Sequence, residues 1–207
     1  VNVGAAANVS ALTNNFTVSA WVRPTSLSGT RRFISAARTA SNNGFGFGTS
    51  GTYPRLSTYG VKDYTRSTAL SLNTWAKLDA VMSGNNVLFY RNGVYLGTVT
   101  NTSGGIANSD DPLRLGASTN TGSSTVAELF KGTLDEVRVC QCVRNTYWIQ
   151  AEYNNQNAPT TFVTAGTMQA APVPVSTPVT VTTTYAWDYG NRLLSISAPA
   201  LPLAASF

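Results

Sequence analysis

Hydrophobic and polar positions alternate along most of the chain, which is the pattern of β-strands with one buried face. Residues 16–22 alternate in this way and stop at Arg23-Pro24, so the pattern predicts a strand that proline ends. Two alternating runs meet at Asn92-Gly93, a dipeptide typical of the type I′ hairpin turn, because both central residues of that turn need positive φ. Further strands are predicted at residues 32–37, 44–48, 55–59, 76–82, 113–116 and 133–140. Many short strands separated by turn residues indicate an antiparallel sandwich or barrel.

Helical patterning is scarce, and the only helix predicted is a turn or two at residues 145–153. The amino-acid composition changes after residue 162. Residues 167–184 contain Pro172, Pro174 and Pro178 and no charge, which is typical of an extended linker. Residues 185–196 read as one strand, which cannot fold alone and needs a partner in this chain or another. The predicted organisation is a domain at 1–166, a Pro/Thr-rich linker at 167–184 and a strand segment at 185–207.

Composition narrows the function. The chain has 207 residues, 43% of them hydrophobic and only 11% charged, which suits one extracellular β domain with a tail. It has no His, so Ser-His-Asp and Cys-His machinery and His-bearing zinc sites are excluded. The net charge of +5 is scattered, with Arg31-Arg32 as the one adjacent basic pair, so we expect no nucleic-acid partner. No apolar run approaches the roughly 18 residues of a membrane helix, so we expect no membrane insertion.

Several stretches carry a family pattern, and they occur in the same order as in that family. They lie at residues 16–24, 72–75, 88–93, 112–116 and 130–139, with a typical ending at 148–156. Together they resemble the concanavalin A-like, laminin-G-type jelly-roll modules of large secreted bacterial proteins. The resemblance covers roughly residues 1–166. It implies an all-β fold, an antiparallel jelly-roll β-sandwich followed by an extended C-terminal tail, at an extracellular or cell-surface location. Residues 185–189 and 191–193 are similar to one tyrosine–aspartate repeat of RHS-type surface proteins.

Concanavalin-like folds also include glucanases, so catalysis has to be considered. Retaining glycosidases need two carboxyl groups about 5 Å apart that face one cleft. The adjacent pairs Asp110-Asp111 and Asp135-Glu136 would point to opposite faces of a strand, and no other suitable pair exists. We therefore expect that the chain is not an enzyme.

A sugar site is predicted in a stretch rich in Gly, Ser, Thr and Arg, where aromatic residues have less reason to be buried. The predicted contact residues are Tyr53, Arg55, Tyr59, Asp63 and Tyr64. If Tyr59 and Tyr64 are exposed together, they form a platform for a sugar ring; the alternative is that they pack under a loop. Trp21 and Trp75 match positions that are core in the resembling modules, so we expect them in the core.

The resemblance also implies a calcium site. In these modules the aspartate at the position of Asp135 often binds a structural Ca²⁺, together with the loop that corresponds to residues 4–8. This loop has alanines where the family often has aspartate, which leaves Asn8 as its only side-chain oxygen. A weak Ca²⁺ site at Asp135 and Asn8 is expected; the alternative is that Asp135 caps a turn or pairs with an arginine.

Cys140 and Cys142 flank Gln141. Residues i and i+2 of a strand lie at the upper distance limit for a disulfide, so we expect two buried free thiols. A Cys-x-Cys bridge, if Cys142 already lies in a turn, and intermolecular pairing are the alternatives.

Two functions are compatible with these features. The first is a non-catalytic carbohydrate-binding and adhesion module, whose partner is a glycan or cell-surface polysaccharide. The second is a structural subunit of an extracellular fibre or surface layer, which self-associates by β-strand exchange through residues 184–207. The resembling modules begin with a further strand ahead of Val1. Its absence would leave an unpaired sheet edge, which residues 185–196 of this chain or of a neighbouring copy could fill; the alternative is that the sequence is cut short at this point.

Overall fold

The computed structural model describes residues 1–4, 12–36, 44–102, 112–119, 125–163, 166, 182–188, 190 and 192–197. The chain divides into two compact units, Val1–Val163 and Thr164–Phe207. The predicted domain boundary after residue 166 lies close to this division, whereas most of the predicted linker lies outside the described residues.

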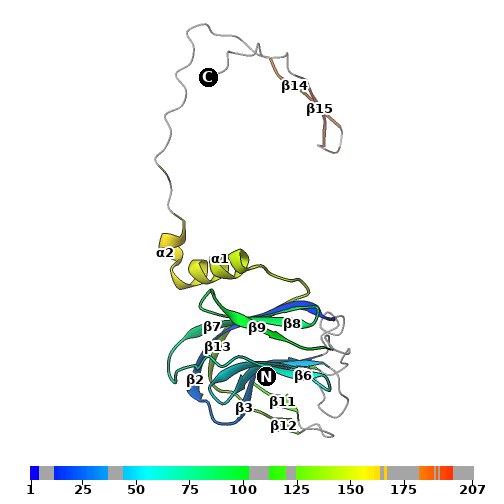
Figure 1. The fold of residues 1–207 in the computed structure, drawn as a ribbon. Coiled ribbons are helices and arrows are strands. Elements are labelled where there is room, and N and C mark those ends of the chain that lie inside the picture. The colour runs from blue at the N-terminus through cyan, green and yellow to red at the C-terminus, as the bar shows by residue number, and fades with distance from the viewer. Residues whose placement is uncertain are drawn as a thin grey trace. The chain divides into compact units, whose positions relative to one another are not determined.

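The first unit is a sandwich of two antiparallel sheets (Figure 1). The six-stranded sheet has the order β1 (Asn2–Gly4), β10 (Leu113–Leu115), β3 (Thr30–Ala36), β4 (Phe45–Ser50), β5 (Tyr53–Thr58), β6 (Lys62–Thr65). The five-stranded sheet has the order β13 (Lys131–Cys140), β2 (Asn15–Ser26), β7 (Ala76–Ser83), β8 (Asn86–Arg91), β9 (Val94–Thr100). A short pair, β11 (Ser118–Thr119) and β12 (Val126–Ala127), adds to the six-stranded side. The predicted all-β antiparallel sandwich is confirmed.

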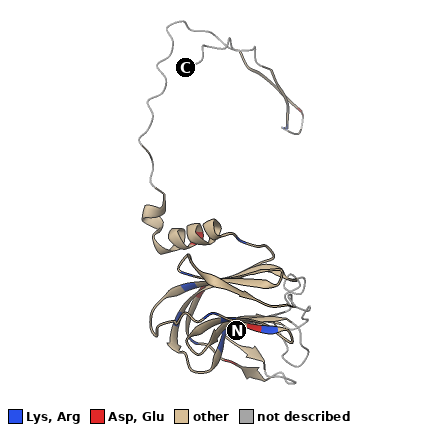
Figure 2. Ribbon diagram, viewed as in Figure 1, with Lys and Arg blue, Asp and Glu red and all other residues tan. Residues whose placement is uncertain are grey.

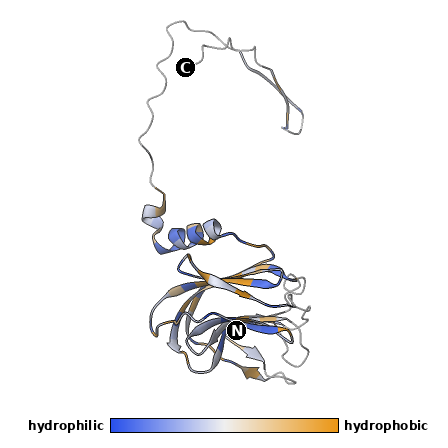
Figure 3. Ribbon diagram, in the orientation of Figure 1, coloured by the Kyte–Doolittle hydropathy of each residue, from blue (hydrophilic) through white to orange (hydrophobic). Residues whose placement is uncertain are grey.

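The core lies between the two sheets, where apolar side chains of both sheets pack together. Hydrophobic and hydrophilic positions are interspersed along the strands in Figure 3. Its largest fully buried side chains are aromatic: Phe16, Phe33, Phe45, Phe47, Phe89 and Tyr64. Few charges interrupt the surface, and they are spread over many elements (Figure 2). The exterior of the first unit is therefore mostly uncharged.

The strand β2 runs to Ser26, past Pro24, so the prediction that proline ends it is wrong. β7 pairs with β2 only as far as Val22, which leaves β13 as the neighbour at Pro24. The β13 register shifts there, between Lys131 and Gly132. A bulge is one of the few sheet positions that tolerate a residue without an N–H group.

The predicted hairpin at Asn92-Gly93 is confirmed. Asn92 has φ 53° and Gly93 has φ 75°, and the turn joins β8 to β9. The Asn92 Oδ1 atom accepts a hydrogen bond from the backbone N–H of Lys77 at 2.9 Å. A Cβ atom on Gly93 would lie 3.2 Å from the Tyr153 Cβ atom. This glycine therefore serves both the turn and the close approach of a helix.

That helix is α1 (Thr146–Asn157), followed by the short α2 (Pro159–Phe162). It is longer than the turn or two predicted. Asn145 caps its first turn, since the Asn145 Oδ1 atom accepts from the Trp148 N–H at 2.9 Å. Only Ile149 is buried along it, so the helix lacks the broad apolar stripe from which its length could have been predicted.

The second unit contains a hairpin of β14 (Thr184–Trp187) and β15 (Leu193–Ser197). The prediction of one strand at residues 185–196 is therefore wrong. The Asp188 carboxylate stabilises the turn between β14 and β15. Its Oδ1 atom accepts hydrogen bonds from the backbone N–H groups of Gly190 and Arg192, each at 2.9 Å. The hydrogen bonds from the Arg192 backbone N–H and the Arg192 guanidinium, and then that from the Gly190 N–H, lower the pKa of Asp188.

Candidate functional site

The site lies on the outer face of the five-stranded sheet, away from the core. Along β2, alternate side chains face inward, and the others, Thr17, Ser19 and Trp21, face outward. Trp21 is paired across the sheet with Asp135 on β13 and with Lys77 on β7. One row of this outer face thus carries a carboxylate, an indole and an ammonium group.

A bulge in β13 adds a second carboxylate. The register shifts between Asp135 and Arg138, and Glu136 adopts φ 48°, in the left-handed region that non-glycine residues rarely enter. The Asp135 Oδ1 atom accepts from the backbone N–H of Glu136 at 2.8 Å and supports this turn. As a result both side chains line the same cavity, and the expectation that they point to opposite faces is wrong.

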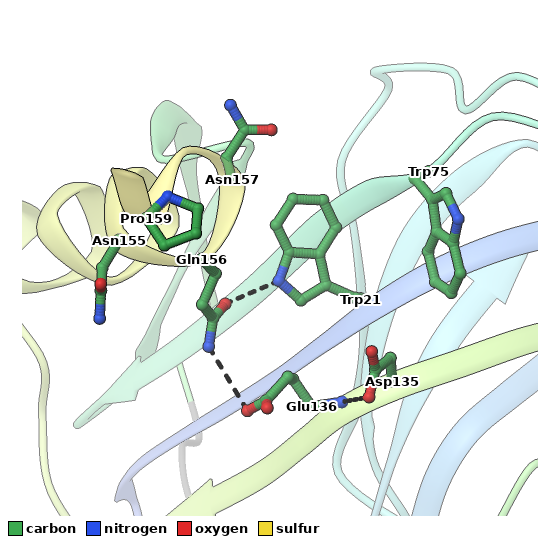
Figure 4. A pocket seen from close by; sticks show the side chains of 8 residues that line it. All are labelled: Trp21, Trp75, Asp135, Glu136, Asn155, Gln156, Asn157 and Pro159. Carbon is green, nitrogen blue, oxygen red and sulfur yellow. Dashed lines mark hydrogen bonds between the residues drawn. The ribbon is translucent and has the colours of Figure 1, made fainter. Parts of the chain in front are cut away.

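Helix α1 crosses the same outer face and supplies the amides (Figure 1). The Trp21 Nε1–H group donates to the Gln156 Oε1 atom at 2.6 Å, and the Tyr153 ring stacks on Trp21 with ring centres 5.7 Å apart. The Gln156 Nε2 atom lies 3.5 Å from a Glu136 oxygen. Gln156 therefore joins the indole of β2 to the bulge of β13, as Figure 4 shows.

Between helix and sheet lies a cavity of about 600 Å³, here called the tryptophan pocket. Its lining residues are Trp21, Trp75, Asp135, Glu136, Asn155, Gln156, Asn157 and Pro159. In Figure 4 the Gln156 amide points toward Trp21 and Glu136, whereas the Asn155 and Asn157 amides point away from them. Trp75 is 41% exposed and Trp21 is only partly buried, so the expectation that both indoles belong to the core is wrong. The physical reason is the alternation itself: Trp21 shares the parity of Thr17 and Ser19, not that of Phe16 and Val18.

An ion network, buried at Lys77 and Asp79 and exposed at Arg138, joins the helix to the sheet. The Lys77 Nζ atom donates to an Asp79 oxygen and, at 2.9 Å, to the Glu152 Oε2 atom. Arg138 reaches the other Glu152 oxygen at 2.6 Å and also pairs with Glu136. Burial raises the pKa of the Asp79 carboxyl to about 6, while Lys77 opposes the shift. The network connects the helix, β7 and the bulge that shapes the tryptophan pocket.

The predicted tyrosine site lies on the other sheet and is only partly assembled. Tyr53 and Arg55 lie on the outer face of β5, and Asp63 on β6 is paired with Ser57, which has the same parity. Arg55 pairs with Asp63 at 2.9 Å, and Tyr53 is 42% exposed. This exposed group stays a prediction as a sugar contact surface.

Tyr64 does not reach the surface, so the predicted platform of Tyr59 and Tyr64 is wrong. Tyr64 faces the core because it is paired with Leu56, whose side chain also points inward. Tyr59 lies on the outer side, where its hydroxyl is 3.3 Å from the Ser118 hydroxyl and the Arg32 guanidinium lies 5.4 Å from its ring. Burial raises the pKa of Tyr59, and the charge of Arg32 opposes this.

The predicted calcium site is incomplete in the described part of the chain. Asp135 is exposed, but Asn8 lies outside the described residues. No group of three or more carboxylate, Cys or His side chains that could hold a metal occurs among the described residues. Ca²⁺ takes six to eight oxygens, so Asp135 would need most ligands from residues 5–8. The site stays a prediction, which a melting-temperature shift on adding a chelator would test.

The two cysteines form a disulfide, Cys140–Cys142. The expectation of two free thiols is therefore wrong, and the alternative of a Cys-x-Cys bridge is correct. The chain turns directly after β13, which ends at Cys140, and this turn brings the two Cα atoms to 5.2 Å, well inside the bridging range. The Thr17 hydroxyl donates to the Cys142 carbonyl at 2.7 Å and holds the turn.

Comparison of the sequence with models of known protein families identifies the family. The chain matches the model of the Concanavalin A-like lectin/glucanases superfamily over residues 1–150. The chain belongs to this superfamily. The match ends before the tail, and the resemblance of this concanavalin A-like chain to RHS-type repeats is not confirmed.

Solved structures give the same fold. The CBM40 of the Ruminococcus gnavus IT-sialidase, bound to α2,3-sialyllactose, matches with TM-score 0.61 and 16% identity, over 73% of this chain and 92% of that one. Domain 4 of AbnA, a GH43 extracellular arabinanase from Geobacillus stearothermophilus, in complex with arabinotriose, matches with TM-score 0.52 and 20% identity, over 67% and 66%. A heptameric SAP-like pentraxin from Limulus polyphemus matches with TM-score 0.54 and 16% identity, over 69% and 73%. A comparison with curated protein sequences finds no match.

No helix among the described residues has the length and apolar character needed to cross a bilayer. The tryptophan pocket combines two indoles with carboxylate and amide groups, and a second cavity on the same sheet is lined by Trp148, Thr17, Ser19 and Glu152 among others.

Proposed function

We propose that the chain is a non-catalytic carbohydrate-binding module of an extracellular or surface protein, and that it binds a glycan in the tryptophan pocket. The observation that carries this proposal is the exposed Trp75 indole beside Trp21 in a cavity rich in side-chain oxygens. A sugar ring stacks its C–H face on an aromatic ring while its hydroxyls bond to carboxylates and amides, and such pockets are mostly apolar with a few polar groups.

The structural neighbours support the proposal at the level of the fold. Two of them are carbohydrate-binding modules or enzyme domains captured with an oligosaccharide, namely the CBM40 with sialyllactose and AbnA domain 4 with arabinotriose. Both come from parent enzymes, as their names state. We propose that this module either attaches a catalytic domain to its glycan substrate or mediates adhesion of a cell surface to a glycan.

A glycan array, followed by isothermal titration with the best neutral oligosaccharide, tests the proposal. Replacing Trp75 by Ala is expected to weaken binding at least about tenfold, because a stacking indole at the centre of a site carries much of the binding energy. Trp148→Ala is the matched control, since Trp148 is 50% exposed but lies outside the tryptophan pocket. Equal losses in both variants, or a flat array with folded protein, would contradict the proposal.

A separate experiment tests whether the chain is non-catalytic. Prolonged incubation of the chain with the bound oligosaccharide is expected to leave it intact when the products are separated by chromatography. Release of shorter sugars would contradict the non-catalytic proposal, and loss of that release in Asp135→Asn and Glu136→Gln would assign the hydrolysis to the two carboxylates of the pocket.

A second candidate function is a subunit that assembles through its tail. The observation in its favour is the β14–β15 hairpin, whose Tyr185, Trp187 and Ile196 side chains are each more than half exposed. A two-stranded hairpin is marginally stable alone in water, and further strands from another copy would cover these side chains.

A further inference from the structure

We propose that the tryptophan pocket selects uncharged, hydroxyl-rich glycans and rejects acidic ones that carry sialic or uronic acid residues. This specificity rests on the proposed function and concerns the same site. It is carried by the charges and hydrogen-bonding groups that line the cavity.

The lining is acidic. Asp135 and Glu136 both line the pocket, and no Lys or Arg is among the described residues that do so. Arg23, two residues along β2 from Trp21, does not line the pocket and donates its Nε–H to the Asn73 carbonyl at 3.1 Å. A ligand carboxylate would therefore meet like charges and no cationic partner.

The charged residues around the tryptophan pocket do not change its net negative charge. Arg138 pairs with both Glu136 and Glu152, and Lys77 pairs with both Asp79 and Glu152. Around these two cations there are thus three carboxylates. Asp135, whose described hydrogen bond comes from the neutral backbone N–H of Glu136, adds a fourth charge at the pocket itself. Like charges placed against each other at an interface oppose binding strongly.

The hydrogen-bonding pattern also favours hydroxyls. The Trp21 Nε1–H donor is already bonded to Gln156, so it is not offered to a ligand carboxylate. Carboxylate oxygens are acceptors only, and sugar hydroxyls donate to them. The indoles of Trp21 and Trp75 stack on the C–H surface of a sugar ring and offer no charge to pair with a ligand carboxylate. A neutral pyranose or furanose meets all three conditions.

This specificity differs from the ligand held by a protein of the same fold. The Ruminococcus gnavus CBM40 was captured with sialyllactose, an acidic glycan. We expect the tryptophan pocket to favour the uncharged parent sugar over such a ligand.

Matched pairs of glycans test the specificity. The full chain is titrated in a chelating, low-salt buffer with lactose against 3′-sialyllactose, and with galactotriose against trigalacturonic acid. The chelator keeps divalent cations such as Ca²⁺ from neutralising Asp135. In each pair that binds, the neutral member is expected to bind at least about tenfold more tightly, and added salt is expected to reduce this ratio by screening.

Asp135→Asn is the decisive variant, because its Oδ1 atom can still accept from the Glu136 N–H while the charge is lost. It is expected to lower the neutral-to-acidic ratio severalfold, whereas Asp188→Asn in the tail, which removes the same charge elsewhere, is expected to leave the ratio unchanged. Equal or tighter binding of the acidic members, or an unchanged ratio in Asp135→Asn, overturns the specificity alone. If no member of any pair binds, and the array is flat as well, the proposed function fails and the specificity fails with it.

Discussion

Trp21 shows how one side chain holds two elements together. Its indole N–H donates to Gln156 on α1 at 2.6 Å, and its ring stacks on Tyr153 of the same helix. The residue thus belongs both to the pocket and to the contact between sheet and helix.

Replacing Trp21 by Phe removes the N–H donor and keeps an aromatic ring against Tyr153. The free energy of unfolding of the first unit is expected to fall by about 1 kcal/mol, the usual net contribution of one hydrogen bond. Urea denaturation followed by circular dichroism measures this change. Trp187→Phe, in the tail hairpin, is the control and is expected to leave the midpoint of the first unit in place. No change in Trp21→Phe would mean that the Gln156 contact contributes nothing.

At the residue scale, alternation could have placed Trp21 correctly, because the core residues of β2 have the opposite parity. The same rule places Tyr53 and Arg55 together on an outer face. The second carboxylate of the pocket could not be predicted in this way. Glu136 enters through a bulge at φ 48°, and no local sequence signal announces a non-glycine residue in that conformation.

At the scale of elements, helix α1 completes the site. It brings Gln156 over Trp21, and it buries Ile149 against Val81 and Tyr90 of the sheet. The sequence predicted only a turn or two here, since the docking uses one apolar residue and a network of charges rather than an apolar stripe. Contacts of this kind depend on the tertiary fold, and local periodicity does not contain them.

The charge network under the helix predicts a pH dependence of stability. The pKa of Asp79 is about 6 in the folded protein and 3.8 as the ordinary value. Between these values the folded state holds a proton that the unfolded chain has lost, so stability decreases as the pH rises from about 4 to about 6, by up to about 3 kcal/mol. The charges of Lys77 and Glu152, which belong to the same network as the Asp79 carboxyl, also contribute to the dependence of stability on pH.

Urea denaturation across this pH range measures the effect. In Asp79→Asn, which cannot titrate, the decrease between pH 4 and pH 6 is expected to disappear. Parallel profiles for the wild-type chain and the variant would show that Asp79 ionises in the fold as it does in the unfolded chain.

At the scale of the whole molecule, the fold was predictable and the tail was not. Five short motifs in order lie within or next to the strands of the sandwich, because alternation and turn residues report directly on strands with one buried face. In the tail, the reversal depends on the Asp188 carboxylate and its hydrogen bonds to Gly190 and Arg192. An alternating pattern that continues through such a turn resembles one long strand.

The second candidate function makes a prediction at this scale. If the tail assembles copies of the chain, the full protein is expected to form high-order species that persist in salt, and a chain that ends at Gly166 is expected to be a monomer. Size-exclusion chromatography with light scattering measures both masses. Monomers of formula mass in both cases would contradict assembly and leave glycan binding as the function.

The central claim is that a glycan occupies the tryptophan pocket, and the indole N–H signals of the chain test it most directly. The chain has four tryptophans, of which Trp21 and Trp75 line the pocket while Trp148 and Trp187 do not. In a ¹H–¹⁵N NMR titration with the neutral glycan, the signals of Trp21 and Trp75 are expected to shift in a saturable way, and those of Trp148 and Trp187 to stay in place. Saturable binding without a shift of the two pocket signals would contradict the account, and would direct attention to the exposed Tyr53 and the partly buried Arg55 on the six-stranded sheet.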